Sequence, residues 1–146
     1  MKFWVSPSRR YLTGLALLTL TSGCFLFKPS VTIDVQGHAD INNGIPFHLL
    51  VRAVTTEQFR SESYAQVARL AAQADKSVLR SEVIYAPGSR PYRLSLKLPP
   101  PKEGSLGLYF LFTAPNGNWR MLLDPPLPRV QHVVLGVGSI QSSSGE

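Results

Sequence analysis

The side chains that could do metal or redox chemistry are few and lie far apart in the 146-residue chain. The single cysteine, Cys24, has no second thiol with which to form an intramolecular disulfide. The three histidines, His38, His48 and His132, fall on separate predicted strands or at their ends. A tetrahedral metal site needs several such ligands brought together. The sequence therefore predicts no metal site, and Cys24 needs an explanation of its own.

The acidic residues and motifs give no sign of catalysis. The chain contains no Gly-x-Ser-x-Gly elbow, His-Glu-x-x-His pair, Walker loop or Gly-x-Gly-x-x-Gly turn. Glu57 and Glu62 lie on a predicted helix and Asp34 and Asp40 near the first strand, without an apolar pocket that could raise the pKa of a general acid. We expect a protein that is not an enzyme, with no catalytic residue, no cofactor and no small-molecule substrate.

The residues before Cys24 have the pattern of an export signal. A basic segment, 1–10, precedes an apolar run, 11–23, that would span only about 20 Å as a helix, short of the bilayer core of about 30 Å. The small residues Ser22 and Gly23 leave the cysteine thiol accessible to modifying enzymes. The stretch 21–24 resembles the lipobox of a bacterial lipoprotein, although the usual Leu lies one place early. A signal anchor with a buried thiol and an ordinary cleaved signal are the alternatives.

Acylation at Cys24 would divide the chain and change its charge. Residues 1–23 would be a cleaved signal peptide, and 24–30 a tether carrying diacylglycerol and acyl chains on Cys24. The net charge would fall from +6 to +3, because Lys2, Arg9 and Arg10 leave with the signal. This ordinary surface gives no support for nucleic-acid binding, which needs a dense basic face. Phe25, in place of the Asp that resembles an inner-membrane retention signal, favours the periplasmic face of the outer membrane.

Beyond the tether, apolar residues alternate with polar ones, as in strands with one buried face. The clearest runs are 31–36, 47–54 and 92–98. An Asn-Gly pair at 116–117 favours a tight hairpin between strands 106–114 and 119–123. With 78–85 and 130–137, about seven strands result. The sequence thus predicts a mainly β fold, a β-sandwich over residues 31–141.

Three further segments carry predictions. A capping box at Thr55–Gln58 and apolar residues at three- and four-residue steps predict one helix, roughly 57–74, that covers a sheet edge or end. Residues 142–146 are expected to be a polar, frayed tail. Trp119 and Arg120 are residue types that anchor interfaces, but packing over the end of the sandwich is the favoured reading for them.

The loop between the first two strands is the predicted recognition site, because loops on a rigid scaffold commonly hold binding residues. Its branched residues Ile41 and Ile45 either tuck back to cap the sandwich or present an apolar anchor. Asn42 and Asn43 would supply hydrogen bonds at the rim, so replacing both with Ala should weaken binding and leave the melting temperature nearly unchanged. The predicted partner-binding residues are Asp40, Ile41, Asn42, Asn43, Gly44 and Ile45.

The order of these features resembles the outer-membrane lipoproteins of the type VI secretion membrane complex, the TssJ family. The likeness spans about 31–137, and the residues that carry it are Asn42-Asn43-Gly44 with Pro46, Phe59, Tyr64 and Val67, Pro87-Gly88, Leu111-Phe112 and Trp119-Arg120. It implies a transthyretin-like sandwich with an inserted helix. It also implies a structural role, in which the loop 40–45 binds the periplasmic domain of the inner-membrane component TssM.

Two other classes of function remain open from the residues alone. The chain could be a free-standing periplasmic lipoprotein that binds a small apolar ligand or inhibits an enzyme. It could also be a structural lipoprotein that binds peptidoglycan. A seven-stranded sandwich fills its interior with side chains, which disfavours ligand carriage.

Overall fold

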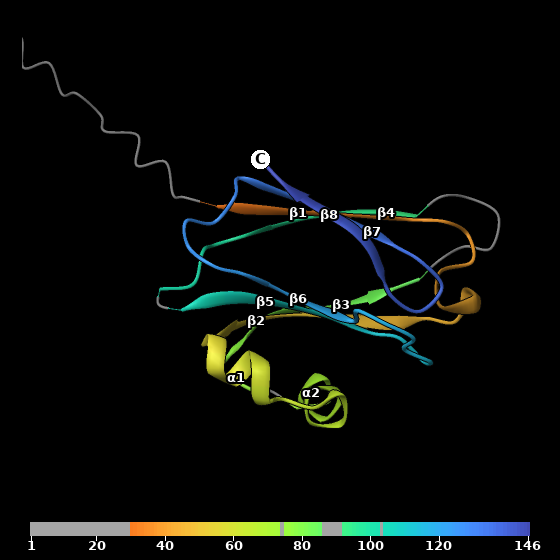
Figure 1. The fold of residues 1–146 in the computed structure, drawn as a ribbon, viewed down its shortest axis with the longest axis horizontal. Coiled ribbons are helices and arrows are strands. Elements are labelled where there is room, and N and C mark those ends of the chain that lie inside the picture. The colour runs from red at the N-terminus through yellow and green to blue at the C-terminus, as the bar shows by residue number, and fades with distance from the viewer. Residues whose placement is uncertain (1–29, 74, 86–91, 103) are drawn as a thin grey trace, which may run out of the picture.

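Eight strands in two layers form the framework of the molecule (Figure 1). The structure, a computed structural model, describes residues 30–73, 75–85, 92–102 and 104–146. The signal peptide, Cys24, most of the tether and the Pro87-Gly88 turn lie outside the described residues. The strands are β1 (Val31–Gly37), β2 (Phe47–Val54), β3 (Val78–Ile84), β4 (Tyr92–Leu98), β5 (Ser105–Leu111), β6 (Arg120–Leu123), β7 (Val130–Leu135) and β8 (Ile140–Gly145).

The strands form two four-stranded sheets. Sheet A has the order β4-β1-β7-β8, and sheet B has the order β3-β2-β5-β6. All pairs are antiparallel except β1 and β7, which run parallel with Val35 opposite Val133. The predicted β-sandwich is therefore confirmed, and each of the seven expected strands is present.

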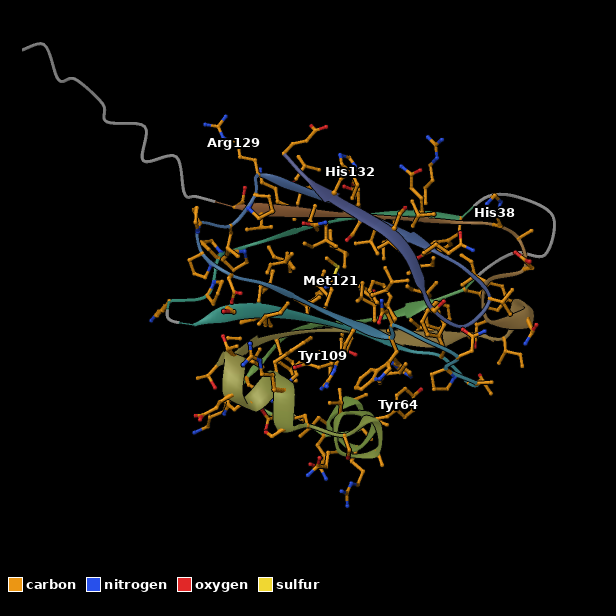
Figure 2. All side chains as sticks on the ribbon, in the orientation of Figure 1. His38, Tyr64, Tyr109, Met121, Arg129 and His132 are labelled. Atoms are coloured by element: carbon orange, nitrogen blue, oxygen red, sulfur yellow. The ribbon has the colours of Figure 1, made fainter. Side chains whose placement is uncertain are left out.

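The predicted alternation places the core between the sheets. In β1, Val31, Ile33 and Val35 are almost fully buried, while the residues between them are more exposed. The apolar rows of β2 and β5 in sheet B face those of β1, β4 and β7 in sheet A across the same core, and Met121 of β6 lies between the layers (Figure 2). Burying one such large apolar side chain stabilises the fold by about 1.5–3 kcal/mol.

A second, smaller apolar cluster lies on the outer face of sheet B. Leu50 and Tyr109 project there and contact Val67 of the helical segment, and all three are fully buried. The central strands β2 and β5 are consequently buried on both faces, unlike any strand of sheet A. Figure 1 shows the helices against this face of sheet B only.

The helical segment consists of two helices, so the prediction of one helix over 57–74 was wrong in this respect. The helices are α1 (Thr56–Ser61) and α2 (Tyr64–Ala71), with Glu62 extended between them. Thr55 caps α1 as predicted. Ser63 caps α2 and forms a second capping box with Gln66. This box was not predicted, because the apolar periodicity continues across it. Two capping boxes eight residues apart start two helices.

The connection between β5 and β6 differs from the predicted tight hairpin. The strands pair as expected, with Tyr109 opposite Arg120. However, neither Asn116 nor Gly117 has a positive φ. The loop instead bonds to the β7–β8 connection, where the Asn116 N–H donates to the Gly138 carbonyl at 3.1 Å and the Ile140 N–H donates to the Asn118 carbonyl at 2.7 Å. These tertiary bonds replace the local turn.

The predicted frayed tail is an edge strand. β8 pairs with β7, with Ser143 opposite Val133, and the Glu146 N–H donates to the Val130 carbonyl at 2.9 Å. The run of serines has no apolar periodicity, because this strand is held by main-chain hydrogen bonds and its side chains face solvent. Sequence patterning detects only strands with a buried row.

The first strand, β1, connects two opposite ends of the sandwich. We call the end where Ser30 leads into β1 the tether end, and the opposite end, formed by the loops 38–46, 112–119 and 136–139, the loop end. β1 runs from the first to the second (Figure 1). Its seven residues make six steps, which span about 20 Å in a strand. Any anchor before residue 30 therefore joins the domain at the end away from the predicted recognition loop.

Candidate partner-binding end

The first loop begins with a residue that closes the core. Ile41 opens the short 3-10 turn η1 (Ile41–Gly44) and has no exposed surface. Its side chain lies over Gly37, where an added Cβ would come within 2.1 Å of the Ile41 Cδ1 atom. A glycine at this point of β1 thus makes the room that Ile41 fills. Of the two roles considered for this isoleucine, the structure shows the capping role.

Asn42 fastens the loop to its neighbours. Its side chain is 1% exposed; its Nδ2 donates to the Ile45 carbonyl at 2.7 Å and to Thr113 Oγ1 at 3.0 Å, and its Oδ1 accepts from the Thr113 N–H at 2.7 Å. Its backbone N–H donates to the Val137 carbonyl at 2.8 Å. Asn42 therefore ties together all three loops of the loop end.

The backbone of this turn is left-handed at three successive positions. Asn42, Asn43 and Gly44 have φ of 50°, 54° and 74°. Asn tolerates this region better than other residues with a side chain, and Gly adopts it freely. The turn itself therefore favours the Asn-Asn-Gly sequence. An Asn-Gly pair, which indicates positive φ, occurs at 43–44 as well as at 116–117, but positive φ was predicted only for the second pair.

Two large apolar side chains of the loops 38–46, 112–119 and 136–139 are exposed to solvent. Ile45 is 47% exposed and Val137 is 39% exposed. They come from loops that Asn42 joins, since this residue bonds to the carbonyls of both. Exposed branched side chains on a hydrogen-bonded framework are already ordered before binding, so a partner would lose little conformational entropy on contacting them.

The predicted site residues thus separate into two groups. Ile41 and Asn42 are buried within the protein, so their side chains are not offered to a partner, which corrects the expected rim role of Asn42. Asp40, Asn43, Gly44 and Ile45 are exposed. Their binding role stays a prediction. Val137, from a loop distant in sequence, was missed because only tertiary structure brings it beside this loop.

A second polar cluster lies between the helices and sheet B. Glu62, at the junction of α1 and α2, accepts from Arg52 Nη1 at 2.7 Å and from the Tyr109 hydroxyl at 2.9 Å. Arg52 Nε also donates to Ser77 Oγ at 2.9 Å, just before β3. The Arg52 side chain is 6% exposed and the Glu62 side chain 16%. This ion pair is therefore largely shielded from water and fixes the helical segment on the sheet.

The Trp119-Arg120 pair belongs to the same attachment. The Arg120 guanidinium donates to the carbonyls of Phe59, at 2.5 Å, and Glu62, at 2.7 Å, where α1 ends. Trp119 meets Tyr64 edge to face, with ring centroids 4.9 Å apart. A cation at a helix C-terminus satisfies the last carbonyls and opposes the helix dipole. The pair is packed within the protein, as predicted, but it lies against the helices on the outer face of sheet B, so the predicted place over the end of the sandwich was wrong.

The titratable groups show no catalytic arrangement within the described residues. Burial, with a smaller effect of the Glu62 carboxylate, raises the pKa of Tyr109 far above its usual value, so this phenol stays protonated and donates its hydrogen bond. Figure 2 shows His38 and His132 far apart on the molecule. Across ranges 30–73, 75–85, 92–102 and 104–146, no three His, Cys, Asp or Glu side chains gather as metal ligands would.

An open groove runs between α2 and the loop-end half of sheet B. Tyr64 and Phe112 both line it; the Tyr64 hydroxyl donates to the Phe112 carbonyl, and burial raises the pKa of this phenol. The residues that line the groove are His48, Tyr64, Ala68, Ala71, Ala72, Leu111, Phe112 and Thr113.

Comparison with known proteins identifies the family of this chain. A family model described as "IglE, N-terminal domain" matches residues 48–135, from the start of β2 to the end of β7. The chain belongs to this family. The IglE N-terminal domain family consists of type VI secretion lipoproteins. None of the curated proteins compared with the chain matches it.

Solved structures of low sequence identity share the fold of this IglE-family protein. TssJ1, a type VI secretion lipoprotein of Pseudomonas aeruginosa, is 17% identical with a TM-score of 0.54, covering 82% of this chain and 97% of its own. The Serratia marcescens protein Lip is 15% identical with a TM-score of 0.58, covering 82% and 98%. A chain from "T6SS protein TssM C-terminal domain (869-1107) from EAEC" is 12% identical with a TM-score of 0.63, covering 80% and 98%.

Among the described residues of this family member, no helix is both long and apolar enough to cross a bilayer.

Proposed function

We propose that this protein is a structural component of a type VI secretion membrane complex, anchored by acylation of Cys24 to the periplasmic face of the outer membrane. Its sandwich would bind the periplasmic domain of the inner-membrane component TssM. Membership of the IglE family and the likeness of fold to TssJ1 and Lip support the secretion role. The proposals that TssM is the partner and that the anchor lies in the outer membrane rest on the resemblance of the sequence to the TssJ family.

The observation that carries this proposal is the placement of the exposed apolar pair Ile45 and Val137. They lie at the loop end, whereas the tether joins at the other end of β1. A protein that links two membranes needs its anchor and its binding surface at opposite ends. The positions of Ser30 and of Ile45 and Val137 at opposite ends of the described domain fit this requirement.

The length of the tether sets how far the domain can stand from the lipid. Seven Cα–Cα steps join Cys24 to Val31, so the fully extended tether spans at most about 25 Å. With the acyl chains in the membrane, the tether end faces the lipid. The loop end then points into the periplasm, toward the domain that it would bind.

The anchor is tested by the variant Cys24→Ser. Without the thiol no acyl chain can be attached, so we expect this variant in the soluble periplasmic fraction or retained as precursor at the inner membrane. The wild-type chain should fractionate with the outer membrane and show the added mass of its acyl groups. Outer-membrane fractionation of Cys24→Ser would rule out this anchor.

The binding surface is tested by Ile45→Asp. A carboxylate at a desolvated apolar contact should raise the Kd for the TssM periplasmic domain at least tenfold, about 1.4 kcal/mol, in a calorimetric titration. Because Ile45 is half exposed, the melting temperature should change by only a few degrees. Val83→Asp, a matched change at a residue that is 56% exposed on β3, should leave the Kd within about twofold. Equal Kd values for both variants and wild type would place the interface elsewhere.

A further inference from the structure

The outer edge of β3 is unusual among the four sheet edges of the described sandwich. β3 pairs only with β2, so its other side is an open edge of sheet B. Val83, on this strand, is 56% exposed, and Tyr85, directly after it, is 63% exposed. Exposed apolar residues on an open edge favour pairing with another strand.

The charges on this strand have a self-complementary order. Arg80 and Glu82 flank Ser81 and form an ion pair with each other. They pair with Val51 and Leu49 of β2, so their side chains lie on the same face of sheet B as those two residues. If a second β3 runs antiparallel with the two copies of Ser81 opposite each other, each Arg80 lies opposite the Glu82 of the other copy. Cross-strand pairs of opposite charge contribute about 0.2–1 kcal/mol each.

The same register also matches the apolar residues. β3 has a bulge where Leu79 and Arg80 together oppose Val51, so these two residues count as one step of the ladder. Val83 then lies opposite Val78 of the second copy, on the face that carries the helices. We infer that two copies of this chain associate through their β3 edges, with Ser81 on the two-fold axis, to form one eight-stranded sheet.

The other three edges do not support such pairing. In β4, the same two-fold register around Ser95 would place Arg93 opposite Lys97 of the second copy, twice, and like charges repel. β6 has only four residues. β8 exposes serines, which specify no register. Only β3 combines opposite charges with exposed apolar residues.

This association is independent of the proposed function. It uses sheet B's edge and leaves Ile45 and Val137 uncovered at the loop end. A two-fold axis normal to the sheet keeps the helices of both copies on the same face. The paired segment is short, so the association should be weak when the chains are dilute and should gain from a high local concentration.

The test uses charge reversal and a cysteine at the axis. Directly opposed residues in an antiparallel pair have Cα atoms about 4.5–5.5 Å apart, which a disulfide can bridge. Full-length chains with Ser81→Cys, carrying two different tags, are co-expressed and separated on non-reducing gels. Ser61→Cys, on the exposed surface of α1, is the matched control. We expect a disulfide-linked dimer with Ser81→Cys and none with Ser61→Cys.

Mixing two charge variants isolates the contact between copies. Glu82→Arg alone places Arg opposite Arg, and Arg80→Glu alone places Glu opposite Glu, so each should reduce the Ser81→Cys dimer at least fivefold. Both variants also lose the ion pair within the chain. Co-expressed, they should restore a heterodimer, because every Arg again lies opposite a Glu.

Each alternative outcome contradicts the inference. No dimer with Ser81→Cys, equal dimers with Ser61→Cys, no rescue in the mixed expression, or a disulfide to a different protein would each exclude β3 pairing between copies. Melting curves of the two charge variants confirm folding, which is expected since the Arg80 side chain is 53% exposed and the Glu82 side chain 27%.

Discussion

Replacing Asn42 with Ala is expected to lower the melting temperature by about 10–20 °C. The change removes the side-chain bonds to Ile45 and Thr113 and leaves the Thr113 N–H and the Ile45 carbonyl without these partners. A buried polar group left unpaired costs about 1–3 kcal/mol. Ala is also disfavoured at the φ of 50°, by roughly 1 kcal/mol. The expected loss is about 3–5 kcal/mol.

Asn43→Ala is the matched control. Asn43 has the same residue type and a similar φ of 54°, but its side chain is exposed and makes no hydrogen bond among the described residues. It should lose only the backbone contribution, about 1 kcal/mol. Thermal melts of the purified full-length chains measure both. Similar small shifts for the two variants would mean that the Asn42 bonds do not hold the loop end together.

Replacing Glu62 with Ala should be about as damaging, for an electrostatic reason. The variant leaves the Arg52 guanidinium, whose side chain is 6% exposed, without its carboxylate, and removes the acceptor of the Tyr109 hydroxyl. Breaking a buried ion pair by removing one partner costs about 3–5 kcal/mol. Loss of the junction between α1 and α2 should also loosen both helices. Urea unfolding of the full-length chain gives the free energy directly.

Two comparisons separate this effect from a general loss of helix. Glu57→Ala removes an exposed acid from the first turn of α1 and should cost only about 0.3–1 kcal/mol. The double variant Arg52→Met, Glu62→Leu removes both charges and should recover much of the lost stability. If the double variant is no more stable than Glu62→Ala, an unpaired Arg52 charge is not the cause.

Much of the sandwich could be predicted because its strands each bury one row of side chains. The alternation of Val31, Ile33 and Val35 is a direct consequence of one face being buried against sheet B. The β8 strand escaped because its serines bury nothing. The break between the helices at Glu62 was not predicted, because the apolar period continues across it. The Ser63-Gln66 capping box is the sequence feature that indicates a second helix.

The candidate site could be predicted only in part. The binding role of the loop 40–45 stays a prediction, and the burial of Ile41 but not of Ile45 depends on the space above Gly37. The burial of Asn42 depends on Thr113, 71 residues further along the chain. The Arg52–Glu62 pair joins a strand to a helix junction. Pairings over such distances follow from the tertiary fold, which a pattern of residue types along the chain does not contain.

Site-specific photo-crosslinking in living cells tests the central claim most directly. A photoreactive amino acid is placed at Ile45, at the loop end, or at Lys97, an exposed β4 residue paired with Thr32 near the tether end. After irradiation, we expect a covalent adduct with the TssM periplasmic domain from position 45 and none from position 97. An adduct from position 97 alone, or none from either position while the secretion complex is assembled, would contradict the proposed arrangement.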